Sequence, residues 1–190
     1  MTWSIFFALL DTGKVISESP SDLYLLPFFE KYKFNHPLYI LYSSGTTGVP
    51  KCIVHGAGGS LIQHKKEHQL HCNINEGDKV FYFTTCGWMM WNWLISSLAS
   101  KASIVLFDGS PFIPNYDNLF KIAQEEKINF FGTGAKYIDT LKNKKINIKD
   151  NFILSDLKTI ASTGSPLINE SFEYVSVSYT HLTLPTNREV

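Results

Sequence analysis

Cysteine is scarce in this sequence. The three cysteines, Cys52, Cys72 and Cys86, are an odd number and form no CxxC pair. This pattern argues against a disulfide framework and favours a reducing compartment. We therefore expect a cytoplasmic protein.

An excess of charge of either sign is also lacking. Lys and Arg together number 17, as do Asp and Glu, so the formal net charge is zero. Such a chain has no field of one sign that would hold nucleic acid or an anionic membrane. A local basic stretch can still bind a small anion, and we expect no nucleic-acid partner.

Long apolar runs are absent as well. The candidate at 87–99 is interrupted by Asn92, Ser96 and Ser97 and is too short to cross a bilayer. The apolar stretch near the amino end lacks a basic flank and a small-residue cleavage site, so we expect no signal peptide.

Apolar residues are nevertheless plentiful, at 44% hydrophobic and 14% aromatic, which is typical of a globular domain with large buried clusters. Strand-like runs alternate with helix-like segments, which predicts βαβ units. The expected fold class is α/β, a layered parallel sheet with helices on both faces. We expect strands at 38–42, 51–55, 80–84, 103–107, 128–131 and 157–161, and helices at 23–34, 58–72, 88–99, 115–127 and 135–142.

One of these helices has a clear amphipathic signature. In the helix predicted from Asn115, the apolar residues Tyr116, Leu119, Phe120 and Ala123 recur at the spacing of one helix face. Asn115 is the expected N-cap, because its side chain can accept a hydrogen bond from a backbone amide that the helix leaves unpaired. A Lys/Asn-rich connector at 142–149 is expected to be a solvated loop.

The most informative segment lies between the first two predicted strands and reads SSGTTGVPK, from Ser43 to Lys51. Its hydroxyl groups can donate hydrogen bonds to phosphate oxygens, and its two glycines let backbone amides approach an anion. Lys51 can add a point charge for a polyphosphate. The candidate nucleotide-binding residues are Ser43, Ser44, Gly45, Thr46, Thr47, Gly48 and Lys51, of which Thr47 and Lys51 are also the candidate catalytic residues.

The spacing disfavours a Walker loop, which needs four residues between its glycines and a Ser or Thr after its lysine. Here two threonines separate the glycines, and Cys52 follows Lys51. An ordinary polar turn between strands is the other interpretation of so short a run.

Five further segments accompany the loop. They are HPLYI at 36–40, GGSLIQH at 58–64, GWMMWNW at 87–93, LFDGSP at 106–111 and STGSPL at 162–167. With the loop, they resemble the adenylate-forming superfamily of acyl-CoA synthetases, luciferases and peptide-synthetase adenylation domains, and within it most the acetoacetyl-CoA synthetases. The resemblance covers roughly residues 36–174 and implies part of the large N-terminal domain of such an enzyme.

The resemblance implies an acid–thiol ligase with two steps. A carboxylate, expected to be acetoacetate, attacks the α-phosphorus of ATP and displaces pyrophosphate, while Mg²⁺ and the loop around Thr46, Thr47 and Lys51 stabilise charge on the departing phosphates. The thiol of CoA then attacks the acyl-adenylate and releases AMP. Acetate or another short acid, and a nucleotide-binding fragment without catalysis, stay open as alternatives.

The residues just after a Gly-Trp pair line the acyl pocket in related synthetases. Carried to this chain, the candidate substrate-binding residues are Trp88, Met89 and Met90. Core packing is the alternative, since tryptophan and methionine side chains are commonly buried. Trp91 and Trp93 are expected to pack.

A second loop assigned by the resemblance comprises Thr163, Gly164, Ser165 and Pro166, which would contact adenine. Many relatives carry an acidic residue where Ser165 stands, although contact through the backbone would survive that change. An ordinary strand-ending turn is the alternative.

His64, His68 and His71 fall at i, i+4 and i+7 and would align on one helix face. Such a face can bind zinc, but Lys65 stands where a zinc-protease motif has Glu. We therefore expect a solvated helix face and assign no metal ligand.

The resemblance is expected to end near Tyr174. Residues 175–190 match nothing expected of the family and resemble a foreign tail, so 1–174 would be a partial AMP-binding domain. A magnesium-side strand end, a ribose-binding acidic residue and a lysine-bearing C-terminal domain of the relatives do not occur in the sequence. We therefore expect the 190-residue chain alone to be inactive.

Overall fold

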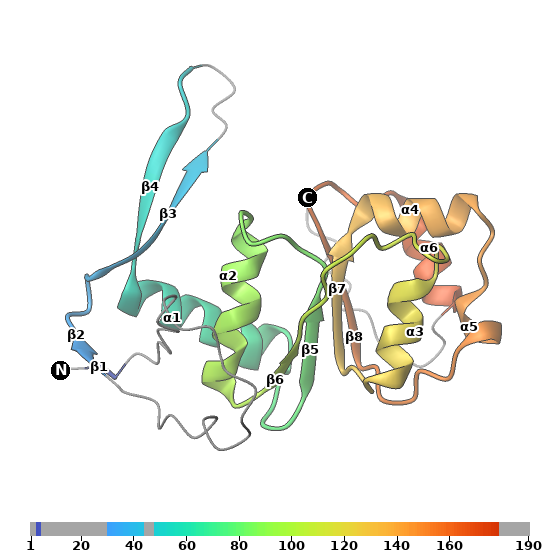
Figure 1. The fold of residues 1–190 in the computed structure, drawn as a ribbon, viewed down its shortest axis with the longest axis horizontal. Helices are drawn as coiled ribbons and strands as arrows, with labels where there is room; N and C mark the ends of the chain where they lie inside the picture. The colour runs from blue at the N-terminus through green and yellow to red at the C-terminus, as the bar shows by residue number, and fades with distance from the viewer. Residues whose placement is uncertain (1–2, 5–29, 44–47, 179–190) are drawn as a thin grey trace, which may run out of the picture. The chain divides into compact units, whose positions relative to one another are not determined.

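The chain divides into two units, Met1–Gln63 and His64–Val190. The structure is a computed structural model that describes residues 3–4, 30–43 and 48–178. Figure 1 labels the helices and strands of both units.

Antiparallel strand pairs form the first unit. β1 (Trp3–Ser4) pairs with β2 (Lys31–Tyr32), and β3 (Pro37–Ser43) pairs with β4 (Lys51–Gly56) as a hairpin (Figure 1). The strands predicted at 38–42 and 51–55 are confirmed, but they belong to no parallel sheet. A short connection can join only antiparallel neighbours, since a parallel pair needs a longer crossover. In the helix predicted at 23–34, residues 23–29 lie outside the described part, and β2 occupies part of the rest.

α1 (Ala57–Lys66) continues into a π-helical turn, η2 (Glu67–His71), so the helix predicted at 58–72 is confirmed. Its first amides are paired, because the backbone N–H groups of Ala57 and Gly58 donate to the carbonyls of His36 and Phe34, each at 2.8 Å. A Cβ on Gly58 would lie 2.2 Å from Cδ2 of the Phe34 ring. A larger residue at 58 would therefore displace the Phe34 ring.

A parallel four-stranded sheet lies at the centre of the second unit. Its strands are β5 (Lys79–Tyr82), β6 (Ser103–Val105), β7 (Phe130–Gly134) and β8 (Thr159–Thr163), in the spatial order β6-β5-β7-β8. Every neighbouring pair is parallel. This confirms the predicted parallel sheet and the four strands that were assigned to it from 80 onward.

Helices cover both faces of this sheet (Figure 1). On one face, α2 (Met89–Ser96) and η3 (Ser97–Ser100) accompany a core cluster that contains Val80 and Tyr82. On the other face, α3 (Asn118–Glu125), α4 (Ala135–Asn143), α5 (Ile148–Asn151) and α6 (Asn169–Ser178) surround a cluster that contains Phe81 and Phe131. Because successive strand residues face opposite sides, a sheet buried on both faces needs continuous apolar strands.

Three local predictions differ from the structure. α3 begins at Asn118, and its N-cap position is Asp117 rather than Asn115, because residues 115–118 form a turn in which Asn118 N–H donates to the Asn115 carbonyl. The predicted solvated connector contains the start of α5, whose Ile148 is fully buried in the core. The boundary predicted after residue 174 lies inside α6, where Val175 is buried, and it stays a prediction.

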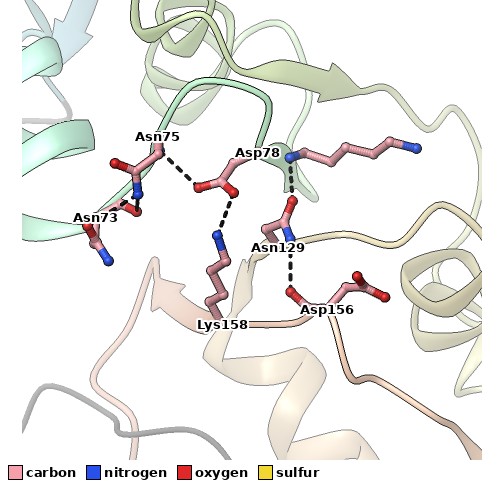
Figure 2. Close-up of polar contacts among 7 residues, drawn as sticks. Asn73, Asn75, Asp78, Asn129, Asp156 and Lys158 are labelled. Atoms are coloured by element: carbon pink, nitrogen blue, oxygen red, sulfur yellow. Dashed lines mark hydrogen bonds and ion pairs between the residues drawn. The ribbon is translucent and has the colours of Figure 1, made fainter.

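Polar side chains tie the amino ends of the strands together (Figure 2). The Asn129 side chain lies just before β7; its Oδ1 accepts from Lys79 N–H at 2.7 Å, and its Nδ2 donates to the Asp156 carbonyl at 2.9 Å. Beside it, Lys158 Nζ lies 2.6 Å from Asp78 Oδ1. One asparagine thus bridges the segments that lead into β5 and β8.

Replacing this asparagine should destabilise the second unit. We expect Asn129→Ala to lower the free energy of unfolding by about 1–3 kcal/mol, because Lys79 N–H and the Asp156 carbonyl lose their partner. Chemical denaturation of the full-length protein that contains this chain measures the effect. Asn143→Ala, at an exposed position at the end of α4, is the control and should change stability by less than about 0.5 kcal/mol. Equal effects of the two variants would contradict this role of Asn129.

Candidate functional site

The predicted phosphate loop connects β3 to β4. Ser43 ends β3 and Lys51 begins β4, and the two residues are paired in the ladder. Ser43 is half-buried, whereas Gly48 and Lys51 are exposed. The other four candidates, Ser44, Gly45, Thr46 and Thr47, lie outside the described residues.

Pairing of β4 with β3 constrains the orientation of Lys51. A strand that is paired along its length holds its first residue in a fixed direction, and the ladder also fixes Ser43 opposite it. An exposed ammonium group that directly follows a Gly/Ser/Thr-rich segment in the sequence is suited to bind an anion. The role of the loop in phosphate binding stays a prediction.

The other two groups of candidates each follow the carboxyl end of a strand of the parallel sheet in the second unit. β5, β7 and β8 run parallel, so their carboxyl ends lie side by side. The segment after β5 leads to Trp88 and α2, and β8 ends at Thr163. Ligands of open parallel sheets characteristically bind outside the carboxyl ends of the strands.

A tight turn follows β8. Gly164 has a φ of 88°, a conformation that side chains other than glycine rarely adopt, and Ser165 and Pro166 are exposed. Thr163 Oγ1 lies 2.8 Å from the hydroxyl oxygen of Tyr82. The turn is therefore anchored at its first residue and open beyond it, while contact with adenine stays a prediction.

The residues predicted to line an acyl pocket differ in their exposure. Trp88 precedes α2 in extended conformation and is 67% exposed, and Met89 is 39% exposed. Met90 is half-buried and packs against the cluster that contains Val80 and Tyr82. Trp88 and Met89 belong to neither core cluster of the described residues, and their role in an acyl pocket stays a prediction.

Trp93, one helical turn further on, packs as predicted. It is 4% exposed, its ring lies edge-on to Tyr82 with centroids 6.0 Å apart, and its indole N–H donates to Glu67 Oε2 at 3.0 Å. A buried tryptophan typically finds such a partner for its one donor.

The expectation of a solvated histidine face was wrong. His64 and His68 are buried, and only His71 of the three is exposed. His68 Nε2 donates to the Trp93 carbonyl at 3.0 Å, and His64 Nδ1 lies 2.8 Å from Ser96 Oγ. The face packs on α2, which the histidine spacing by itself did not reveal.

His68 is consequently held neutral. Burial lowers its pKa to about 4, and the nearby His64 adds to this effect, against smaller opposing contributions from the Trp93 carbonyl and Glu67. Its Nδ1 atom is buried without a hydrogen-bond partner. A proton added there would therefore have no acceptor.

Sequence reasoning missed Tyr82 and Gly132, which support the carboxyl edge of the sheet. Tyr82 lies inside the strand predicted at 80–84, whereas Gly132 directly follows the strand predicted at 128–131. In the structure Gly132 lies inside β7, and a glycine inside a strand is a signal of close backbone approach. A Cβ on Gly132 would lie 2.0 Å from Cδ2 of the Tyr82 ring.

The described residues contain neither a metal-binding group nor a membrane-spanning helix. Across 3–4, 30–43 and 48–178, no three His, Cys, Asp or Glu side chains come together as a metal-binding group. Nor is any helix within these ranges both long and apolar enough to cross a membrane.

Comparison with known proteins places these features in a family. The AMP-binding enzyme family model matches residues 10–181. The chain is 56% identical over 147 residues to an acetoacetyl-coenzyme A synthetase of Rhizobium meliloti (strain 1021), covering 77% of this chain and 23% of that protein. It is 49% identical over 154 residues to the malonamoyl-CoA synthetase vrtB of Penicillium aethiopicum, covering 74% of this chain and 21% of that protein.

A solved structure is similar as well. The acetoacetyl-CoA synthetase from Streptomyces lividans superimposes with a TM-score of 0.78 at 40% sequence identity, covering 83% of this chain and 25% of that one. The chain thus spans about a quarter of the length of the relatives that it matches.

Proposed function

Because the chain belongs to the AMP-binding enzyme family, we propose that the full-length protein containing it is an acid–thiol ligase that joins acetoacetate to CoA at the expense of ATP. The observation that carries the proposal is the 56% identity to an acetoacetyl-coenzyme A synthetase. The substrates are small molecules, and the three free cysteines are in keeping with a cytoplasmic enzyme.

The reaction proceeds in two steps. A carboxylate oxygen of acetoacetate attacks the α-phosphorus of ATP, the bond from that phosphorus to the bridging oxygen breaks, and pyrophosphate leaves with the electron pair. The sulfur of CoA then attacks the acyl carbon, the thiol proton is lost, and the bond to AMP breaks. The products are acetoacetyl-CoA, AMP and pyrophosphate.

In the first step, the loop between β3 and β4 binds the β- and γ-phosphates. Hydroxyl and amide groups of Ser43 to Gly48, with Thr47 foremost, donate to phosphate oxygens, and the exposed Lys51 ammonium offsets the charge that develops on the leaving pyrophosphate. Mg²⁺ accompanies ATP and neutralises part of its charge when bound.

The two groups at the carboxyl edge of the sheet bind the rest of the substrates. Thr163 to Pro166 contact adenine, mainly through the backbone of the turn. Trp88, Met89 and Met90 line the acyl pocket, where flexible methionine side chains adapt to a short chain. Support comes from the parallel strands β5 and β8, whose carboxyl ends lie at the same edge of the sheet.

A second acid is favoured by one specific observation. The 49% identity to a malonamoyl-CoA synthetase makes malonamate, in which an amide replaces the methyl ketone, the alternative substrate. Contacts in the acyl pocket decide between the two, because a site that hydrogen-bonds an amide discriminates strongly against an analogue without it.

The test is acid-dependent exchange of pyrophosphate into ATP by the full-length protein. We expect acetoacetate to support exchange better than malonamate, acetate or butyrate. Met90→Ala should alter this ranking by about 1–3 kcal/mol in relative kcat/KM, since the volume of one pocket wall changes. Ile153→Ala, which truncates an apolar side chain that is 80% exposed, is the control and should leave the ranking unchanged. Exchange without preference among the acids, or a Met90 variant that loses only stability, would contradict these assignments.

A further inference from the structure

Tyr82 reaches across a strand to hold the turn that follows β8. It is the last residue of β5, and β7 lies between β5 and β8 in the sheet. Its hydroxyl oxygen nonetheless lies 2.8 Å from Thr163 Oγ1, at the end of β8. The hydrogen bond therefore links two strands that are not neighbours.

The absence of a side chain at Gly132 allows the Tyr82 ring to extend across β7 to Thr163. Tyr82 is paired in register with Gly132 of β7, and Gly132 is paired with Ala161 of β8. Because Gly132 has no Cβ, the phenol ring lies directly over its backbone, where an added Cβ would meet Cδ2 at 2.0 Å and Cε2 at 2.2 Å. Any larger residue at 132 would push the ring away from Thr163.

The ring is also confined on its other side. Trp93 of α2 lies edge-on to Tyr82 with centroids 6.0 Å apart, and Tyr82 is only 5% exposed. Burial raises the pKa of the phenol, against a smaller lowering by the Thr163 hydrogen bond. The hydroxyl therefore keeps its proton at neutral pH and stays able to donate.

We infer that Tyr82 is a positioning residue that holds the Thr163–Pro166 turn in the arrangement that receives adenine. The inference rests on the proposed function, in which this turn contacts the nucleotide. Beyond Thr163 the turn is exposed and contains the positive-φ Gly164. Its start is therefore the place where a single side-chain hydrogen bond constrains it most.

The experiment removes the hydroxyl and measures ATP binding in catalysis. In the full-length enzyme, we expect Tyr82→Phe to raise the KM for ATP in pyrophosphate exchange about three- to tenfold, the worth of one hydrogen bond. The KM for the acid and kcat should change less than about twofold, because only the nucleotide side is displaced.

A matched control separates positioning from simple loss of stability. Tyr137→Phe also deletes a buried hydroxyl, one that donates to the Tyr116 carbonyl at 2.9 Å on the opposite face of the sheet. It should leave the KM for ATP unchanged. An equal rise in both variants would overturn the inference.

A double-mutant cycle tests the route through Thr163. Thr163→Val removes the partner hydroxyl, and Thr163→Ser keeps it. We expect Tyr82→Phe to add nothing in the Thr163→Val background and to keep its effect in the Thr163→Ser background. Multiplicative effects of Tyr82→Phe and Thr163→Val would overturn the inference while leaving the proposed function intact. Wild-type enzyme that shows no exchange with any acid would instead contradict the proposed function itself.

Discussion

Lys51→Ala should slow acetoacetate-dependent pyrophosphate exchange about 10²–10³-fold, the usual loss when one preorganised group beside a developing charge is removed. Lys51 is exposed at the start of β4, next to the loop proposed to bind the β- and γ-phosphates. Its ammonium charge matters most when negative charge accumulates on the departing pyrophosphate. We therefore expect kcat to fall more than the KM for ATP rises.

Two further variants make this test specific. Lys33→Ala removes an exposed lysine from the same unit and should leave exchange unchanged. Lys51→Arg keeps the charge but replaces a compact ammonium with a planar fork, so we expect partial activity. If Lys51→Ala exchanges pyrophosphate at the wild-type rate and circular dichroism shows an intact fold, the loop does not handle the phosphates of ATP.

His68 should make the second unit sensitive to acid. Its pKa is about 4 in the folded protein, compared with 6.5 as the ordinary value. A depressed histidine pKa means that the unfolded chain binds the proton more tightly, so stability is complete above pH 6.5 and is lost as the pH falls toward 4. At pH 5, the loss amounts to about 2 kcal/mol relative to neutral pH.

Thermal unfolding of the full-length protein between pH 7.5 and 5 measures this contribution. His68→Gln can still donate to the Trp93 carbonyl but cannot take up a proton, so we expect it to lose less stability on acidification than the wild type by about 2 kcal/mol. His71→Gln, an exposed position on the same helical segment, is the control and should follow the wild type. Parallel pH curves for His68→Gln and the wild type would rule out this role.

Local sequence patterns identified most of the second unit. The strands at 80, 103, 128 and 157 and the helices between them were predictable because their apolar residues must cover two faces of one sheet. The start of α3 was not, since the Asn115 carbonyl closes a turn before the helix begins. Asn and Asp are both favoured at the N-cap, so residue type alone cannot show which of Asn115, Asp117 and Asn118 precedes the helix.

The site was predictable to a different degree in each part. Motif chemistry led to the loop before Lys51 and to the turn at Thr163, because glycines and hydroxyl groups gather there. It could not identify the buried partner of that turn, since Tyr82 resembles any other apolar strand residue in the sequence. It also misjudged His68, whose burial depends on Trp93 of α2, 25 residues further along the chain.

The absence of a Cβ at Gly132 limits which substitutions related sequences can accept at positions 132 and 82. A methyl group at 132 would collide with the aromatic ring at 82, so neither position is free to vary while the other stays the same. A lineage that gains a side chain at 132 must first or simultaneously replace the tyrosine with a smaller residue, and it then gives up the hydroxyl that contacts Thr163. Positions 82, 132 and 163 are therefore expected to be inherited as a set, and their covariation can be read from any sufficiently deep collection of homologous sequences.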